Sequence, residues 1–287
     1  MLVNPNTDKI LSAVKHQSKC LIEGLDKLTP NQWDSPSRCH RWAIKDVVSH
    51  LVAINGFFLN SINQSLEGVF LPSHGMPNPG TGNAAEMSDG IASRAIQMSE
   101  TTLSRQTDAM DALTHLEDVL ITTWQQLDET QWDMPAYHPV NQLSPNLILE
   151  LKLMEIILHS WDIFNSIDTT YQISKQHGIL LCDVWKNEVL NRWLFTPDPS
   201  QHDPIQIELK LGTTKSLRLI TYDSNLIFTD QYENGDSTDT VIKISPENLA
   251  LVITARNNIE DLLETKKAHI EGIKDRAQLF HNWFRGS

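Results

Sequence analysis

The spacing of apolar residues changes near Asp168, and this change limits the possible folds more than any other feature of the chain. Before it, apolar residues recur at helical spacing over long segments. After it, short runs alternate between apolar and polar residues. Helical spacing is typical of amphipathic helices, and strict alternation is typical of half-buried strands. We therefore predict an α+β protein with a helical domain at 1–168 and a smaller α+β domain at 169–287.

The first domain is predicted to contain long helices joined by two long connections. They are expected at 7–28, from 43 to about 65, at 84–127 with a break near 100–104, and at 145–165. Ser144 suits an N-cap and Pro145 suits the first helical position. Four long helices indicate a four-helix bundle, a fold that builds metal sites from side chains on facing helices.

The second domain is predicted to open with a linker helix and to continue with an antiparallel sheet. The linker helix is expected at 172–194, and the strands at 205–211, 216–222, 225–230, 240–245 and in the segment HIEGI. Further helices are expected at 246–256, 259–264 and 275–284, the first opened by Pro246 with Ser245 as its cap.

One segment of the first domain, from Glu150 to Asn165, contains a candidate metal-binding pattern. It contains no Gly or Pro, and Glu155, His159 and Asp162 fall in one narrow sector of the helix it predicts. Residues four apart on a helix lie one above the other, so a carboxylate and an imidazole can reach the same point. The best candidate for a third ligand is His50, on the flank of the helix predicted from 43.

Two imidazoles and one carboxylate suit zinc or another borderline divalent ion. Three protein ligands leave one coordination position open, as in catalytic sites, and Asp162 is placed to hold an imidazole N–H. The structural alternative is common: a Glu–His pair at this spacing is usually a surface pair, and a single helix histidine is usually structural. Spacing alone leaves both readings open.

Composition excludes several classes of partner. The net charge of −13 argues against nucleic acid and anionic membranes, which attract basic patches. The cysteines are three, odd in number and widely spaced, which indicates a reducing compartment. No apolar run approaches the roughly 20 residues of a membrane span. We expect a soluble cytoplasmic protein, a monomer or homodimer, that binds a small-molecule substrate.

Two signatures resemble a known family. Asp46-Val47-Val48-Ser49-His50-Leu51, preceded by a turn ending in Trp42, resembles a segment of the mycothiol-dependent maleylpyruvate isomerase-like proteins, members of the DinB-like superfamily. The Glu155, His159 and Asp162 spacing resembles the second signature of that family. The end of the chain is similar to sterol carrier protein type 2. The turn differs: Cys39-His40-Arg41-Trp42 stands where the family has Cys-Pro-Gly-Trp, so we expect a different backbone there.

This resemblance implies a metal-dependent enzyme that uses a low-molecular-weight thiol, such as mycothiol or glutathione. His50, Glu155 and His159 would be the zinc ligands. The metal is thought to stabilise the thiolate, which adds to an electrophilic substrate in isomerisation or S-transfer. Asp162 and Arg94 would take catalytic roles, and Arg256 would bind the cofactor.

Two other functions are consistent with the sequence. A zinc-bound water would make the protein a hydrolase or lyase, with no need for a thiol. Alternatively, the second domain would bind a small apolar ligand without catalysis, since a fold does not by itself define a function.

Overall fold

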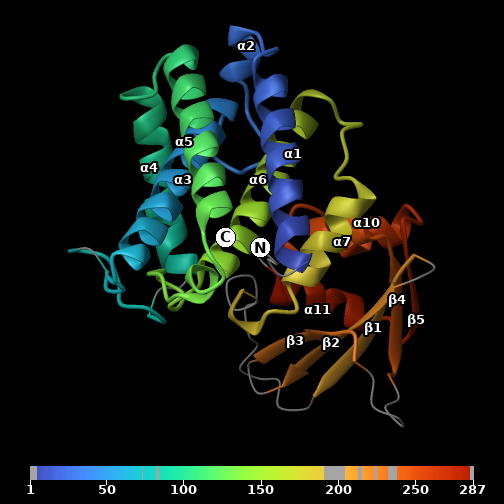
Figure 1. Ribbon diagram of the computed structural model, residues 1–287. Coiled ribbons are helices and arrows are strands. Elements are labelled where there is room, and N and C mark those ends of the chain that lie inside the picture. Colours follow the sequence, from blue (N-terminus) through green and yellow to red (C-terminus); the bar gives the residue numbers. More distant parts are fainter. Residues whose placement is uncertain are drawn as a thin grey trace. The chain divides into compact units, whose positions relative to one another are not determined.

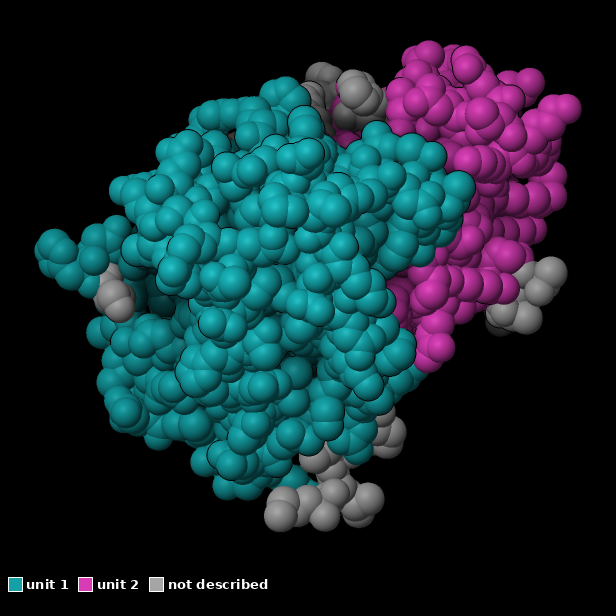
Figure 2. Space-filling model, turned by 90° about the horizontal axis from the view of Figure 1, so that it is seen from above, with its two compact units in different colours: residues 1–172 teal, residues 173–287 magenta. Residues whose placement is uncertain are grey.

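The computed structural model describes residues 5–72, 74–81, 84–190, 204–212, 215–222, 225–231 and 238–284. The chain divides into two compact units, residues 1–172 and residues 173–287, which Figure 2 shows in different colours. The sequence prediction placed this boundary after residue 168. The first unit is helical and the second is α+β, so the predicted fold class is confirmed.

The first unit is a bundle of long helices with short helical turns in its connections (Figure 1). Its elements are α1 (Pro5–Leu25), α2 (Pro30–Trp33), α3 (Ile44–Leu66), α4 (Ala84–Glu100), α5 (Gln106–Gln126), η1 (Gln131–Asp133) and α6 (Pro145–Ile167). Helices α1, α3, α5 and α6 form the predicted four-helix bundle, and α4 packs on α3. The expected break in the 84–127 segment is confirmed, because α4 ends at Glu100 and α5 begins at Gln106.

Helix α6 is buried along most of its length. Its start matches the sequence signals: Pro145 stands in the first turn, and Ser144 Oγ accepts a hydrogen bond from the Leu147 N–H at 3.3 Å. A helix that is apolar on most sides packs at the centre of a domain. Polar side chains on α6 therefore lie inside the bundle, where water cannot satisfy them.

Among the described residues, the second unit contains one sheet and several helices. The helices are α7 (Lys175–Val184), α9 (Pro246–Ile253), α10 (Ile259–Glu264) and α11 (Arg276–Trp283). The strands are β1 (Ile205–Leu211), β2 (Lys215–Tyr222), β3 (Asn225–Thr229), β4 (Thr240–Ile244) and β5 (Ala268–Gly272). Buried and half-buried residues alternate along β1, as expected for a sheet with one face in the core, and α7, α10 and α11 lie on one side of the sheet (Figure 1).

The prediction of a wholly antiparallel sheet is wrong at one pair. The strand order is β3-β2-β1-β4-β5, and β1 pairs with β4 in parallel while the other pairs are antiparallel. Strands β2 and β3 extend the sheet on one side of β1, and the chain then returns to pair β4 with its other side. Parallel neighbours need such a crossover, and alternation within each strand does not encode it.

The predicted linker helix over 172–194 is interrupted, because α7 covers Lys175–Val184 and residues 188–190 are helical again after a break. Helix α7 ends at Val184, and the Asn187 side chain then accepts a hydrogen bond from the Val189 N–H at 3.0 Å. Asn competes with the helical backbone for hydrogen bonds in this way, which explains the interruption. Residues 191–194 lie outside the described part of the chain.

Glu150 on α6 gives a pH-dependent prediction for stability. The residue is 9 % exposed, and burial raises its pKa to about 7 from 4.5. The folded protein thus holds this proton more tightly than the unfolded chain, so the contribution of Glu150 to stability is fully present below about pH 4.5 and is lost as the pH rises through about 7. We expect Glu150→Gln to raise the free energy of unfolding by up to about 3 kcal/mol at pH 8 and by little at pH 4.

Urea denaturation of wild type and Glu150→Gln at the two pH values measures this difference. Glu129→Gln, which changes an exposed carboxyl in the connection after α5, is the matched control and is expected to have no such pH dependence. An equal effect of Glu150→Gln at both pH values would contradict the prediction.

Candidate metal centre

Helix α6 brings three of the predicted site residues together on one face. His159 Nε2 lies 3.2 Å from Glu155 Oε2, and His159 Nδ1 lies 2.9 Å from Asp162 Oδ2. The two nitrogens of one imidazole point in opposite directions, so the ring bridges the two carboxylates. Asp162 thereby orients the ring with Nε2 towards Glu155. Histidines that bind a metal are commonly held in this way, by a carboxylate that contacts the ring nitrogen not bound to the metal.

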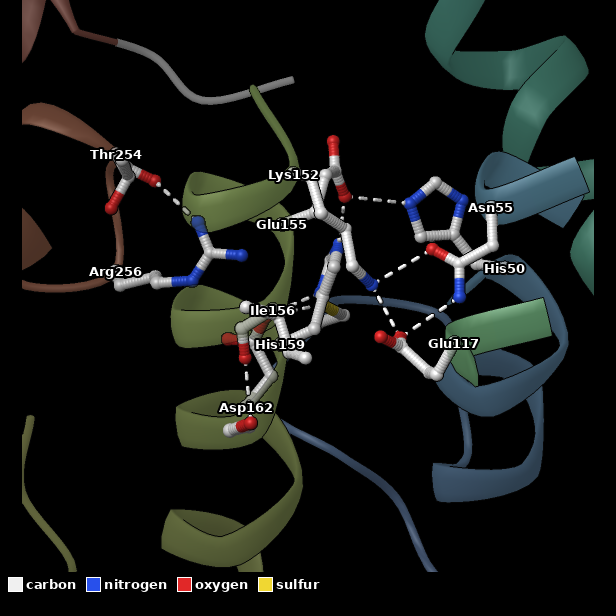
Figure 3. Close-up of polar contacts among 12 residues, drawn as sticks. His50, Asn55, Glu117, Lys152, Glu155, Ile156, His159, Asp162, Thr254 and Arg256 are labelled. Carbon is white, nitrogen blue, oxygen red and sulfur yellow. Dashed lines mark hydrogen bonds and ion pairs between the residues drawn. The ribbon is translucent and has the colours of Figure 1, made fainter. Parts of the chain in front are cut away.

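His50 reaches the same carboxylate from α3 (Figure 3). Its Nε2 lies 3.0 Å from Glu155 Oε2, and the His50 and His159 rings meet edge to face with centroids 4.9 Å apart. One ligand atom from each of the three residues lies within 4.8 Å of the others. Both histidines are buried and Glu155 is half-buried. The structure therefore brings together the three residues predicted as ligands.

The protonation states of this cluster follow from its surroundings. Burial lowers the pKa of His50, although its hydrogen bond to Glu155 acts in the opposite direction. Burial acts to raise the pKa of Glu155, but hydrogen bonds with His159 and His50 outweigh it and hold the pKa well below its ordinary value. Burial acts to lower the pKa of His159, yet Cys39 and Asp162 raise it well above the ordinary value. Metal ligation needs a neutral imidazole and an ionised carboxylate, so His159 would release a proton on binding a cation.

Two similar loops set the positions of α3 and α6. Each carries Gln-Trp-Asp-x-Pro, at 32–36 and 131–135, and in each the Trp is buried: Trp33 in α2 and Trp132 in η1. Each loop then closes with a short antiparallel bridge, Pro36 to Ala43 and Ala136 to Leu143, directly before the ligand-bearing helix. The same local device thus fixes where both helices begin.

The start of α3 is fixed by Asp46 of the first signature. Its carboxylate accepts a hydrogen bond from the Ala43 N–H at 2.8 Å and another from the hydroxyl of Ser99 on α4. The first contact caps the helix, and the second ties α4 to it. Asp46 therefore acts in the fold, while His50 one turn later faces the candidate metal centre.

The turn at 39–42 contains a residue in the left-handed region. The Trp42 N–H donates to the Cys39 carbonyl at 3.1 Å, and Arg41 has φ of 75°. Pro then Gly at the two central positions is the preference of a type II turn, which needs φ above zero at the second. Arg41 adopts that left-handed conformation at a cost of roughly 1–2 kcal/mol. Arg41 therefore holds a conformation that favours glycine, and whether the backbone differs from that of the family stays a prediction.

The loop that carries this turn is docked on α6. The Arg38 N–H donates to the Asp162 carbonyl at 2.9 Å, and Arg38 Nε donates to Asn165 Oδ1 at 2.8 Å. Cys39 Sγ lies 3.0 Å from Asp162 Oδ2 and 3.7 Å from His159 Nδ1. Cys39 thus lies on the Nδ1 side of His159, behind the imidazole and away from its Nε2 atom.

Sequence reasoning missed several neighbours of the cluster. The Trp42 ring lies over both imidazoles, with centroids 5.1 Å from His50 and 6.0 Å from His159. Its place at the end of the turn that precedes the first signature was a usable signal. His138 lies near Glu155, and burial lowers its pKa to about 4. The contacts of Asn55, Glu117 and Lys152, described below, carry no sequence signal because they join three different helices.

The two predicted arginines stay predictions. Arg94 is exposed on α4, and no hydrogen bond or ion pair among the described residues joins it to His50, Glu155 or His159. Arg256 follows α9 in the second unit, where its Nη1 donates to the Thr254 carbonyl at 3.3 Å.

The fold and these residues define a helical-bundle protein with a candidate His/Glu/His metal site and an appended α+β unit. Residues 14–164 match the mycothiol maleylpyruvate isomerase N-terminal domain, and the chain belongs to that family. No curated protein sequence matches the chain.

Two solved structures of one enzyme show the same fold at low identity. The mycothiol-dependent maleylpyruvate isomerase matches with a TM-score of 0.56 and 12 % identity, covering 88 % of this chain and 90 % of that one. A histidine-to-alanine mutant of that enzyme matches with a TM-score of 0.58 and 11 % identity over the same shares. A colibactin self-resistance protein, solved with double-stranded DNA, matches with a TM-score of 0.47 and 13 % identity over 59 % of this chain and all of that one. Within the described residues, no helix combines the length and apolar character of a membrane span.

Proposed function

We propose that this protein is a metal-dependent enzyme that uses a low-molecular-weight thiol either to isomerise a small electrophilic substrate or to transfer that thiol onto it. The observation that carries the proposal is the meeting of His50, Glu155 and His159 at one point. Two imidazoles and a carboxylate fit a zinc-type ion and leave a coordination position for a further group. Family membership supports the same conclusion.

When bound, such an ion would supply the positive charge that favours the deprotonated form of a thiol. The chain's own residues have separate roles. Glu155 would bring the negative charge that offsets the cation, and His50 and His159 both direct Nε2 towards the same oxygen of Glu155, Oε2. Asp162 holds His159 in the tautomer that leaves Nε2 free to bind. Trp42 packs against both imidazoles.

Because Cys39 lies behind His159, a free thiol would have to come from a separate molecule. Mycothiol and glutathione are the thiols we would test first. Arg94 is proposed to bind a carboxylate of the substrate, and Arg256 is proposed to bind the thiol cofactor.

The test is a panel of thiols and electrophiles, with and without zinc. Zinc-loaded protein is incubated with mycothiol, glutathione or no thiol, together with maleylpyruvate or an alkylating electrophile. Isomerised products, which have the same mass as the substrate, are separated by chromatography, and thiol conjugates are identified by mass spectrometry. We expect turnover only when zinc and one of the thiols are both present. Turnover without thiol would instead indicate hydrolysis or lyase chemistry, and no turnover by zinc-loaded protein with any pair would count against thiol chemistry.

A further inference from the structure

Three polar side chains form a fully buried cluster inside the bundle, which we call the core triad: Asn55 on α3, Glu117 on α5 and Lys152 on α6 (Figure 3). Each is 0 % exposed. Lys152 Nζ donates to Asn55 Oδ1 at 2.8 Å and also to Glu117 Oε1. Asn55 Nδ2 donates to the same Glu117 oxygen at 2.8 Å. The triad thus ties three helices together through directional contacts.

Stability alone does not explain this arrangement. Transfer of a carboxylate and an ammonium group out of water has a large desolvation cost, and apolar residues of similar volume at such positions are often equally or more stable. Moreover, Glu117 Oε2 is buried with no hydrogen-bond partner among the described residues. A partly satisfied buried network is energetically worse than an apolar core.

The position of the triad relates it to the candidate metal centre. On α6, Lys152 stands one turn before Glu155, and Lys152, Glu155 and His159 lie within about 60° of one another by the helix period. On α3, Asn55 follows His50 by five residues. The contact between Lys152 and Asn55 therefore joins the two ligand-bearing helices within about two turns of the ligands.

We propose that the core triad positions the candidate metal centre by fixing the axial register of α3 against α6. This inference rests on the proposed metal site. A shift of α3 by one residue would move His50 by about 1.5 Å relative to Glu155, whereas metal ligands hold their distances to within about 0.2 Å. Apolar contacts are not directional and allow such a shift more readily. The hydrogen bonds that join Lys152, Asn55 and Glu117 are directional, so they resist such a shift.

The test separates positioning from stability with the variant Asn55→Leu/Glu117→Leu/Lys152→Met. All three apolar side chains are similar in size to those they replace. We expect an unchanged or higher urea midpoint for the metal-free protein. We expect zinc affinity, measured by competition with a chelator, to fall roughly 10- to 100-fold, as for the loss of outer residues in metal sites.

A second variant keeps the test decisive if the triple variant does not fold. Asn55→Leu alone leaves the Lys152–Glu117 pair in place and is expected to fold and to lose zinc affinity. The matched control is Ser65→Ala, which removes a buried hydrogen bond of α3, to the Pro135 carbonyl at 2.7 Å, about 22 Å along the helix from His50. It should leave zinc affinity unchanged.

The outcomes distinguish this inference from the proposed function. Absence of zinc binding by wild type would overturn both. Wild-type zinc affinity in Asn55→Leu and in the folded triple variant would overturn the positioning role alone and leave the metal site standing.

Discussion

His159→Ala is expected to lower the zinc content of the purified protein from near one ion per chain to background. The variant removes the nitrogen that faces Glu155 and leaves only His50 and Glu155, and two ligands do not hold zinc tightly. Loss of a residue that only hydrogen-bonds to a metal ligand lowers the metal affinity roughly 10- to 100-fold. Loss of a ligand itself is therefore expected to lower the zinc affinity more than about 100-fold.

Metal content by mass spectrometry and thermal unfolding with and without zinc measure this effect. Zinc at about 100 times its dissociation constant should stabilise wild type by about 2.7 kcal/mol and leave the variant unchanged. His115→Ala, which removes an exposed imidazole from α5, is the control and should bind zinc as wild type does. Zinc stabilisation of His159→Ala equal to that of wild type would show that the ion binds elsewhere.

Lys152→Met is expected to lower the free energy of unfolding of the metal-free protein by about 3–5 kcal/mol. The substitution keeps the volume of the side chain but leaves Glu117 buried without its cation. The remaining hydrogen bond from Asn55 satisfies one oxygen only. The loss therefore reflects an uncompensated buried charge, not a cavity.

The double variant Lys152→Met/Glu117→Leu is the control for this prediction. It removes both charges and should recover most of the lost stability, so that the two substitutions together cost less than Lys152→Met alone. Urea denaturation of the three proteins at pH 7 completes the comparison. A loss below about 1 kcal/mol for Lys152→Met would be typical of an exposed ion pair and would contradict burial of the pair.

Local signals predicted most of the elements correctly. Helix α6 begins at Pro145 after its Ser144 cap, β1 spans the predicted residues 205–211, and α9 begins at Pro246. Caps, first-turn prolines and alternation act over a few residues, so they are visible in sequence. The parallel pairing of β1 with β4 was not predicted, because it depends on where a distant strand returns to the sheet.

The residues of the candidate site also divide into those that local sequence patterns predicted and those that they did not. Glu155, His159 and Asp162 were predicted from the helix period, because they share one helix. His50 entered as a candidate from a second helix, and its assignment as a ligand came from the resemblance. The positions of Trp42 over the imidazoles and of Cys39 behind His159 were missed, because both residues are in a loop without periodicity.

The sequence by itself determined the α+β class, the boundaries of most helices and strands, and the face of α6 that carries an acid and an imidazole. Only the tertiary structure decided that His50 meets that face, that Arg41 takes a left-handed conformation, and that Asn55, Glu117 and Lys152 share one buried cluster. The physical reason is the distance along the chain over which each effect acts. Backbone propensities and helix periods act between residues close in the chain, whereas these contacts arise when helices far apart in sequence pack together.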